Sequence, residues 1–194
     1  MSELTVYSGA KIQKSIKEGI LYGNRIPRDF FVTSGTGESN ITIHAGSYHL
    51  ALKAARIEMC NIITYSSILP GIANLTERPE KIQHGSVMES IMSVCHARKG
   101  ELATAGIIYS WLHDRETGAR YGGLVCEHEG NYDKTELVGR LNASLEELFQ
   151  NGYADRFYLD EKQIISESFI PRKNYGTALV ALCFTSYYYP VFDT

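Results

Sequence analysis

An apolar run that ends in two serines and a proline sets the tightest constraint on how this chain folds. Residues 61–64 read Asn-Ile-Ile-Thr, and Tyr65-Ser66-Ser67-Ile68-Leu69-Pro70 follows directly. The run predicts a buried strand, and Pro70 prevents that strand from continuing because proline lacks a backbone N–H and fixes its φ. The sequence therefore predicts that both hydroxyls lie at a bent strand end.

A hydroxyl held at such a bend can react with its own backbone. A fixed geometry brings the Ser67 hydroxyl to the Ser66 carbonyl far more often than a free peptide does. Attack would turn the peptide into an ester, and elimination with loss of ammonia would leave a pyruvoyl group at residue 67. The same residues also suit an ordinary Ser-Ser turn that ends a strand, so the rest of the chain has to decide between the two interpretations.

The composition suits one globular domain in a reducing compartment. The chain has 194 residues, 44% of them hydrophobic and 21% charged, and its net charge is −3. No basic stripe predicts nucleic-acid binding, and no leader or long apolar window predicts secretion or membrane insertion. The four cysteines are far apart, which favours reduced core thiols over disulfides or zinc. We therefore expect a cytoplasmic protein with no metal and with no nucleic-acid or membrane partner.

Helix signals appear in two main places. Apolar spacing predicts a helix over 46–56, and Asp133 with Glu136 forms a capping box that starts a second helix, which Gly152 ends. The second helix places Val138, Leu141, Leu145 and Leu148 on one face. Residues 1–28 are expected to be an N-terminal extension with a short amphipathic helix at Ile12, Ile16 and Ile20.

Strand signals fill most of the remaining sequence. The expected strands are 30–33, 61–66, 87–94, 103–111, 124–127, 164–169 and 177–188. Residues 34–39 are interpreted as a glycine loop, and 113–119 as a hairpin connection. The glycine loop lacks the lysine of a phosphate-binding loop, so it does not predict nucleotide binding. The pattern predicts a single α/β domain of the α+β type with a largely antiparallel sheet.

Several segments together resemble the pyruvoyl-dependent arginine decarboxylases over about residues 30 to 187. The segments are Gly37-Glu38-Ser39, the helix from Tyr48, Asn61 with Ser66 to Pro70, Gly100-Glu101, and residues 123–130, Gly-Leu-Val-Cys-Glu-His-Glu-Gly. The resemblance implies a four-layer αββα sandwich over residues 29–194. It also implies a homotrimer of self-cleaved protomers with active sites between neighbours.

The same resemblance implies a covalent cofactor that the chain makes itself. Autocatalytic cleavage of the zymogen between Ser66 and Ser67 would give a β chain of residues 1–66 and an α chain of residues 67–194. Ser67 would become the pyruvoyl group, which forms a Schiff base with an amino acid and replaces pyridoxal phosphate as the electron acceptor.

Two catalytic roles follow from the resemblance. Asn61 would assist processing, because an amide can donate a hydrogen bond to the oxyanion of the acyl shift. Glu127 would return a proton to Cα after CO₂ leaves, since burial on an apolar strand lets a carboxyl keep its proton near neutral pH. Glu129 shares the face of Glu127 and would tune it. The alternatives are an Asn61 that satisfies strand-end backbone groups and acids that end a strand in solvent.

Substrate contacts are assigned to His49, Leu52 and Glu38. The family carries an aspartate at the position of His49, and that aspartate binds the guanidinium of arginine. A histidine does not supply this anion, which opens the site to another amino acid, although Glu38 could restore the charge. His49 could also simply reach the surface beside the apolar stripe.

The sequence thus supports two hypotheses from different classes. The first is a self-processing pyruvoyl-dependent amino-acid α-decarboxylase, with conversion of arginine to agmatine, a polyamine precursor, as the family default. The second is an uncleaved, catalytically silent relative that acts as a partner subunit or a ligand-binding module.

Overall fold

The computed structural model describes residues 23–190, so the helix predicted at Ile12, Ile16 and Ile20 lies outside the described residues. The chain divides into two compact units. Residues 27–187 form one unit, and the two chain ends, 1–26 and 188–194, form the other. Strand β1 (Ile26–Pro27) pairs with β11 (Tyr187–Tyr188).

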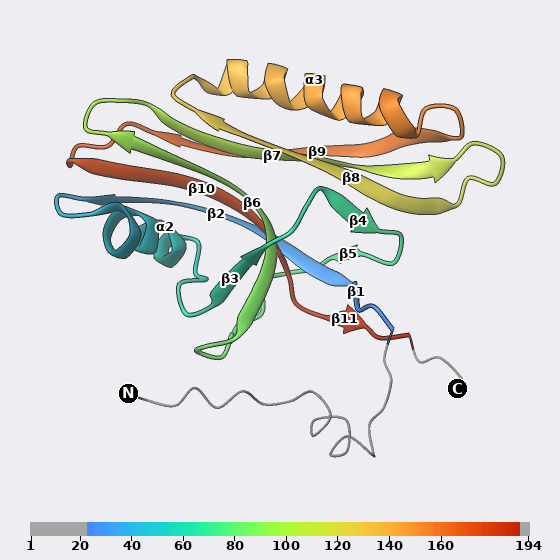
Figure 1. Ribbon diagram of the computed structural model, residues 1–194, viewed down its shortest axis with the longest axis horizontal. Helices are drawn as coiled ribbons and strands as arrows, with labels where there is room; N and C mark the ends of the chain where they lie inside the picture. Colours follow the sequence, from blue (N-terminus) through green and yellow to red (C-terminus); the bar gives the residue numbers. More distant parts are fainter. Residues whose placement is uncertain (1–22, 191–194) are drawn as a thin grey trace, which may run out of the picture. The chain divides into compact units, whose positions relative to one another are not determined.

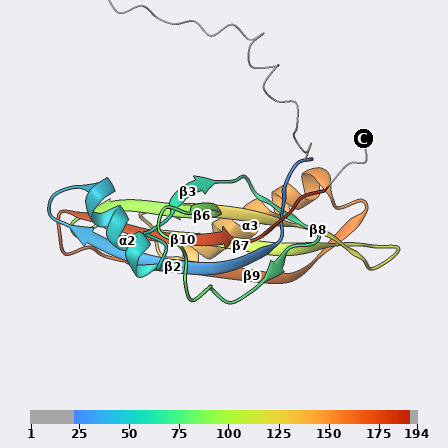
Figure 2. The ribbon, with the colours of Figure 1, turned by 90° about the horizontal axis from the view of Figure 1, so that it is seen from below.

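Two sheets make up the unit of residues 27–187 (Figure 1). The first sheet has the order β3 (Asn61–Thr64), β6 (Val87–Arg98), β10 (Tyr175–Phe184), β2 (Asp29–Ser39) and β5 (Asn74–Leu75). The second has the order β4 (Ile68–Pro70), β8 (Arg120–Gly130), β7 (Ala103–Asp114) and β9 (Phe157–Phe169). The long strands pair antiparallel, with β10 between β2 and β6 (Figure 2), whereas β3 pairs parallel with β6 and β5 parallel with β2.

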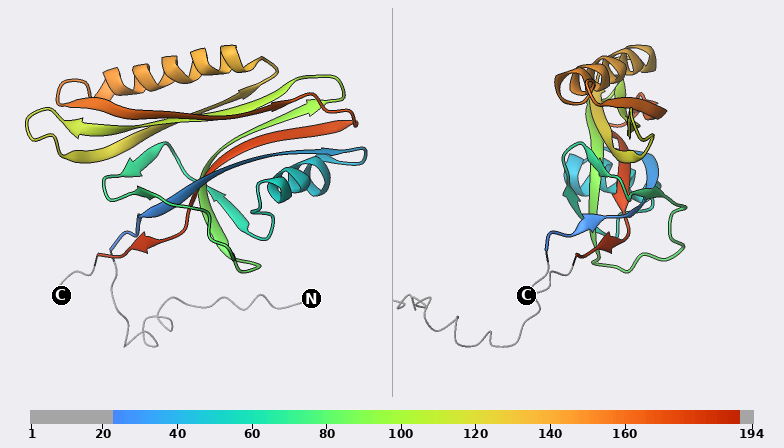
Figure 3. Two further views of the ribbon diagram at one scale, coloured as in Figure 1. Left: turned by 180° about the vertical axis from the view of Figure 1, so that it is seen from behind. Right: turned by 90° about the vertical axis from the view of Figure 1, so that its right-hand side faces the viewer.

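The main apolar core lies between the two sheets. Phe30 of β2 packs edge-on against Tyr109 of β7, with ring centroids 5.9 Å apart, and also contacts Trp111 and Phe184. Helix α3 (Lys134–Gly152) covers the outer face of the four-stranded sheet. The π-helix η1 (Ile43–Tyr48) and α2 (His49–Ala54) cover the outer face of the five-stranded sheet (Figure 3). These four layers confirm the predicted αββα sandwich.

Helix α3 forms where the sequence predicts it, but the face that it turns toward the sheet differs from the predicted one. The Asp133 side chain accepts a hydrogen bond from the Glu136 N–H at 2.9 Å, which satisfies an otherwise unpaired donor of the first turn. The buried stripe is Leu137, Leu141, Leu145 and Phe149. Val138 is 37% exposed, so its predicted place in the stripe is wrong, because the residues that recur every four positions from 137 face the sheet.

The predicted glycine loop at 34–39 is wrong, because β2 runs unbroken from Asp29 to Ser39. Both glycines of this segment face the helical layer at contact distance. A Cβ on Gly37 would lie 2.2 Å from the Ser47 carbonyl oxygen, and one on Gly35 would lie 2.3 Å from the Ala51 carbonyl oxygen. The glycines therefore permit a close backbone approach between a strand and a helix.

The hairpin between β7 and β8 forms where the sequence predicts it. Asp114 accepts hydrogen bonds from the backbone N–H groups of Glu116 and Thr117, and Gly118 takes a φ of 69°. The Arg156 guanidinium also donates to Asp114, at 2.9 Å. The hydrogen bonds from the Thr117 N–H and then from Arg156 lower the pKa of Asp114 to about 2. The turn is thus held by an ionised side chain and a glycine in the left-handed region.

The strand predicted to be buried at residues 61–66 is instead a short edge strand. β3 ends at Thr64, and Asn61, Ile63 and Thr64 are exposed, because β6 is its one neighbour in the sheet. The chain then leaves the five-stranded sheet and enters the four-stranded sheet as β4, which pairs with β8 (Figure 1). Residues 65–67 are the crossing between the two sheets.

Candidate active site

The two serines are held by backbone hydrogen bonds to strands of both sheets. The Tyr65 N–H donates to the Ser90 carbonyl of β6 at 2.8 Å, and the Ser67 carbonyl accepts from the Val125 N–H of β8 at 3.0 Å. The Tyr65 ring also packs on Phe184, with centroids 5.7 Å apart. This segment is therefore fixed at each end, and its bend does not depend on Pro70 alone.

The carbonyl between the two serines already has a hydrogen-bond donor. The Ile68 N–H donates to the Ser66 oxygen at 3.0 Å, closing a three-residue turn. A donor at this oxygen polarises the carbonyl and stabilises negative charge that develops on it. The sequence pattern gave no signal for this donor, because any residue except proline supplies a backbone N–H.

Glu127 of β8 lies against the second serine. The Ser67 hydroxyl donates to Oε2 of Glu127 at 3.3 Å, a long hydrogen bond that joins residues 60 positions apart. Burial raises the pKa of Glu127, the hydrogen bond from Ser67 opposes that rise, and the charge of Glu129 adds to it. The carboxyl therefore keeps its proton at a higher pH than an exposed glutamate does.

Strand alternation orients the acids of β8 as predicted. His128 points to the helix side of the sheet, where its Nε2 lies 2.8 Å from the Ser144 hydroxyl of α3. Glu127 and Glu129 therefore share the opposite face. Glu127 is partly buried there, which differs from the alternative of a strand end in solvent.

Asn61 lies at the far end of β3 from the serines. Its side-chain amide donates to the Gly85 carbonyl at 3.1 Å. Three strand steps of about 3.3 Å separate it from Thr64, and the chain continues three residues further to Ser67. In this structure Asn61 satisfies a strand-end backbone group, and its assistance to processing stays a prediction.

The three residues assigned to substrate lie apart from Ser67 within this chain. His49 is exposed on α2, and Leu52 is 7% exposed in the core between α2 and the five-stranded sheet. Glu38 of β2 accepts from the Arg172 N–H at 2.7 Å. The structure therefore joins Ser66, Ser67 and Glu127, whereas His49 and Leu52 lie on α2 and Glu38 lies on β2.

Sequence reasoning missed Glu89, an acid enclosed next to the residue that anchors Tyr65. Glu89 of β6 is 2% exposed and shares the inward face with Ile91, which belongs to the core between the sheets. Its place inside the run Val87-Met88-Glu89-Ser90-Ile91 is the sequence signal for a buried carboxyl. Such a group is stable only with hydrogen-bonding partners nearby.

Comparison with known protein families identifies the family of this chain. The family model for pyruvoyl-dependent arginine decarboxylases matches residues 29–188. The chain belongs to this family. Its name implies a covalent pyruvoyl group, and a partly buried serine beside a carboxyl, at a carbonyl with its own donor, fits such a group.

Relatives within the pyruvoyl-dependent arginine decarboxylase family come from bacteria and archaea. The chain is 32% identical over 120 residues to the pyruvoyl-dependent arginine decarboxylase AaxB of Chlamydia abortus, a match covering 55% of this chain and 61% of the relative. It is 35% identical over 116 residues to pyruvoyl-dependent arginine decarboxylase 2 of Methanosarcina mazei, covering 58% and 60%. The chain spans about three fifths of the length of the curated relatives it matches.

Two further features concern the environment of this site. Within residues 23–190, no helix is both long enough and apolar enough to span a membrane. The same residues contain no group of three or more His, Cys, Asp or Glu side chains placed to hold a metal ion. Cys60, Cys95, Cys126 and Cys183 are free thiols.

Proposed function

We propose that this chain is a self-processing, pyruvoyl-dependent amino-acid α-decarboxylase that cuts itself between Ser66 and Ser67. The observation that carries the proposal is the 3.3 Å hydrogen bond from the Ser67 hydroxyl to Glu127, at a bend fixed between two sheets. Family membership supports the decarboxylase class.

The processing step uses groups already in place. The Ser67 Oγ attacks the Ser66 carbonyl carbon, the hydroxyl proton passes to the backbone nitrogen of residue 67, and the Ile68 N–H stabilises the oxyanion. The Ser66–Ser67 C–N bond then breaks, leaving an ester and a free amine. In the elimination, the Cα proton of residue 67 passes to solvent as the Cβ–Oγ bond breaks, which releases the Ser66 carboxylate and leaves a Cα=Cβ double bond. A proton then adds at Cβ to give an imine, and water replaces the nitrogen, which leaves as ammonia.

In decarboxylation, Glu127 is the proton donor. The pyruvoyl group, once formed, supplies the carbonyl that accepts electrons as CO₂ leaves. Glu127 lies beside residue 67 and, because burial raises its pKa, holds a proton on its carboxyl for transfer to Cα.

Substrate choice and assembly belong to the same proposal. The substrate is an amino acid, with arginine as the default and a non-guanidinium side chain favoured by His49. His49 and Glu38 lie apart from Ser67 in one chain, which supports a site completed by neighbours in a homotrimer. Ile63 and Ile68, 47% and 51% exposed beside the serines, support such a contact. The free thiols support a cytoplasmic location.

Intact-mass analysis tests the proposal. Wild-type protein should give two chains, residues 1–66 and 67–194, with the second lighter by one ammonia than its serine form. Ser67→Ala should stay one chain, because it has no attacking hydroxyl. Ser66→Ala is the matched control and should still be cut. Full cleavage of Ser67→Ala would overturn the assignment, and uncut wild-type protein would favour the silent relative.

A further inference from the structure

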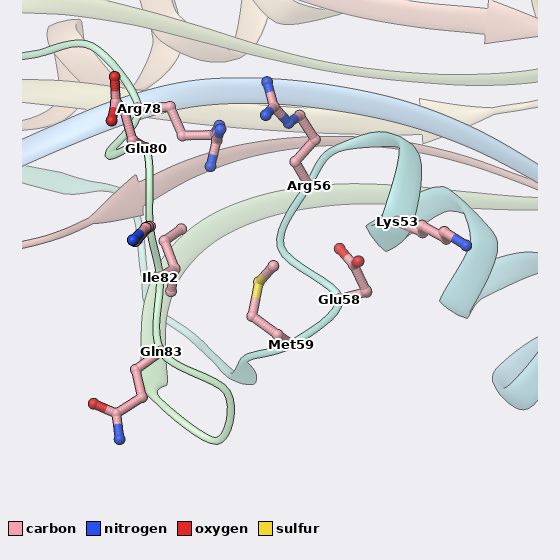
Figure 4. Close-up of a pocket in the computed structure, with 9 residues that line it drawn as sticks. Lys53, Arg56, Glu58, Met59, Arg78, Glu80, Ile82 and Gln83 are labelled. Atoms are coloured by element: carbon pink, nitrogen blue, oxygen red, sulfur yellow. The ribbon is translucent and has the colours of Figure 1, made fainter.

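A hollow of about 670 Å³ lies between the end of α2 and the segment that follows β5 (Figure 4). Its charged lining is Lys53, Arg56, Arg78 and Lys81 against Glu58 and Glu80. Ser67 and Glu127 do not line it. Four cations against two anions leave a local excess of positive charge in a protein whose net charge is −3.

Two arginines extend into this hollow without a partner. Figure 4 shows the guanidinium groups of Arg56 and Arg78 reaching toward one another from the two sides of the hollow. Among residues 23–190, neither guanidinium has an ion-pair or hydrogen-bond partner. Two facing guanidinium groups repel each other, and a planar or tetrahedral anion between them removes the repulsion and accepts forked hydrogen bonds.

The backbone of Arg56 is strained in a way that places its side chain. The Arg56 N–H donates to the Lys53 carbonyl at 3.0 Å, and the Ile57 N–H donates to the Leu52 carbonyl at 3.0 Å. This pair of bonds is a Schellman motif, and residue 56 takes the left-handed position with φ 61°. Glycine fits that position without strain, yet an arginine occupies it.

The floor of the hollow adds an acceptor and an apolar patch. Oε2 of Glu58 is buried and has no hydrogen-bond partner among the described residues. Met59 and Ile82 lie below the two guanidinium groups in Figure 4. A buried carboxylate oxygen without a partner is costly, so a ligand that donates a hydrogen bond to it would be favoured.

We propose that this hollow is a binding site for a small dianion, a phosphate monoester or a dicarboxylate, that also carries a hydroxyl or ammonium donor. The anionic group lies between Arg56 and Arg78, the donor reaches Glu58, and the carbon skeleton packs on Met59 and Ile82. The site is formed by one chain and does not involve Ser67, so it does not depend on the proposed decarboxylation.

Calorimetric titration of the full chain at low ionic strength measures this binding. Inorganic phosphate and succinate are the two anion probes, and the tighter of them identifies the anion class. Binding should weaken with added salt, because the guanidinium groups lie near the surface. The Ser67→Ala variant should bind equally well. Absence of saturable binding for both probes, with wild-type protein folded, would overturn the proposal.

Two substitutions test the arginines against matched controls. Arg56→Gly removes a guanidinium and relieves the left-handed strain, so it should fold at least as well and bind about tenfold more weakly. Glu161→Gly relieves a similar strain, at φ 52°, on β9 and should bind normally. Arg78→Gln should also bind the anion about tenfold more weakly, whereas Arg140→Gln on α3 should keep the wild-type affinity. Unchanged binding in Arg56→Gly and Arg78→Gln would overturn the assignment.

The role of Glu58 is tested with a matched pair of ligands. Glycerol 3-phosphate and propyl phosphate share a three-carbon phosphate ester, and the first alone carries hydroxyls. Wild-type protein should favour glycerol 3-phosphate, and Glu58→Gln should reduce that preference while strengthening the binding of propyl phosphate, because a buried negative charge is removed. Equal binding of both esters to wild-type protein would overturn the donor part of the proposal.

Discussion

The two helix-covered layers of this protein are held together in different ways. Helix α3 docks through side chains: Asp133 caps it, and a stripe of four apolar residues meets the four-stranded sheet. The helical segment η1–α2 is short, has no side-chain cap, and approaches β2 at the distance that Gly35 and Gly37 permit. Helix α3 therefore carries its own cap and a long apolar stripe, whereas η1–α2 is held by its close approach to the strand beneath it.

The same difference separates the candidate functional residues. Glu127 belongs to the sheet under α3 and meets Ser67 within one chain. His49 lies on α2, so its position depends on the close packing of that helix. The proposed chemistry therefore depends on the layer that α3 covers, whereas the proposed specificity depends on the layer that η1–α2 covers through close backbone contact.

The largest expected effect is a loss of CO₂ release when Glu127, on the sheet that α3 covers, is replaced without a change of fold. Glu127→Gln should leave cleavage largely intact and should lower CO₂ release by about 10²–10⁴-fold, because an amide does not protonate Cα. A denaturing gel and a CO₂ assay on the same sample measure both effects. Activity retained within a few-fold would show that Glu129 or a water supplies the proton.

The second effect tests how the helices are held. Gly37→Ala should lower the free energy of unfolding by about 3 kcal/mol, because its Cβ would lie 2.2 Å from the Ser47 carbonyl oxygen. Gly139→Ala on α3, where no atom lies within 4 Å of the added Cβ, should raise it by about 1 kcal/mol. Urea denaturation measures both free energies of unfolding. Equal effects of the two substitutions would contradict the difference between a helix held by close backbone contact and one held by side chains.

The third effect concerns specificity on the α2 layer. His49→Asp should raise the rate of CO₂ release from arginine about tenfold relative to other amino acids, because a carboxylate pairs with a guanidinium and an imidazole does not. The assay compares arginine with aspartate, glutamate, histidine and aromatic amino acids. Strong preference of the wild type for arginine, with no change in the variant, would place His49 outside the substrate pocket.

The smallest effect is a shift in pH dependence. Activity that needs protonated Glu127 should fall as pH rises through its raised pKa. Glu129→Gln removes a negative charge that contributes to that rise, so the pKa of Glu127 should drop and activity should fall at a lower pH than in wild type. A pH–rate profile of both proteins checks the direction, and a shift toward higher pH would contradict it.

Local patterns predicted those parts of the structure whose causes are local. The N-cap that Asp133 forms with the Glu136 N–H, the turn at Asp114 to Gly118, and the alternation at Glu127 and Glu129 each depend on residues a few positions apart. The buried-strand prediction at 61–66 was wrong because an apolar run does not reveal how many neighbours a strand has in its sheet.

By itself, the sequence determined where most strands and both helical segments lie, and it placed two hydroxyls before a proline, because propensity, capping and periodicity act between residues a few positions apart. Only the tertiary structure decided what these residues meet. It carried residues 65–67 from one sheet to the other, aligned Glu127 with Ser67, and turned two glycines from an expected loop into a helix contact. Contacts between residues far apart in sequence depend on how whole layers pack, and local patterns carry no record of that packing.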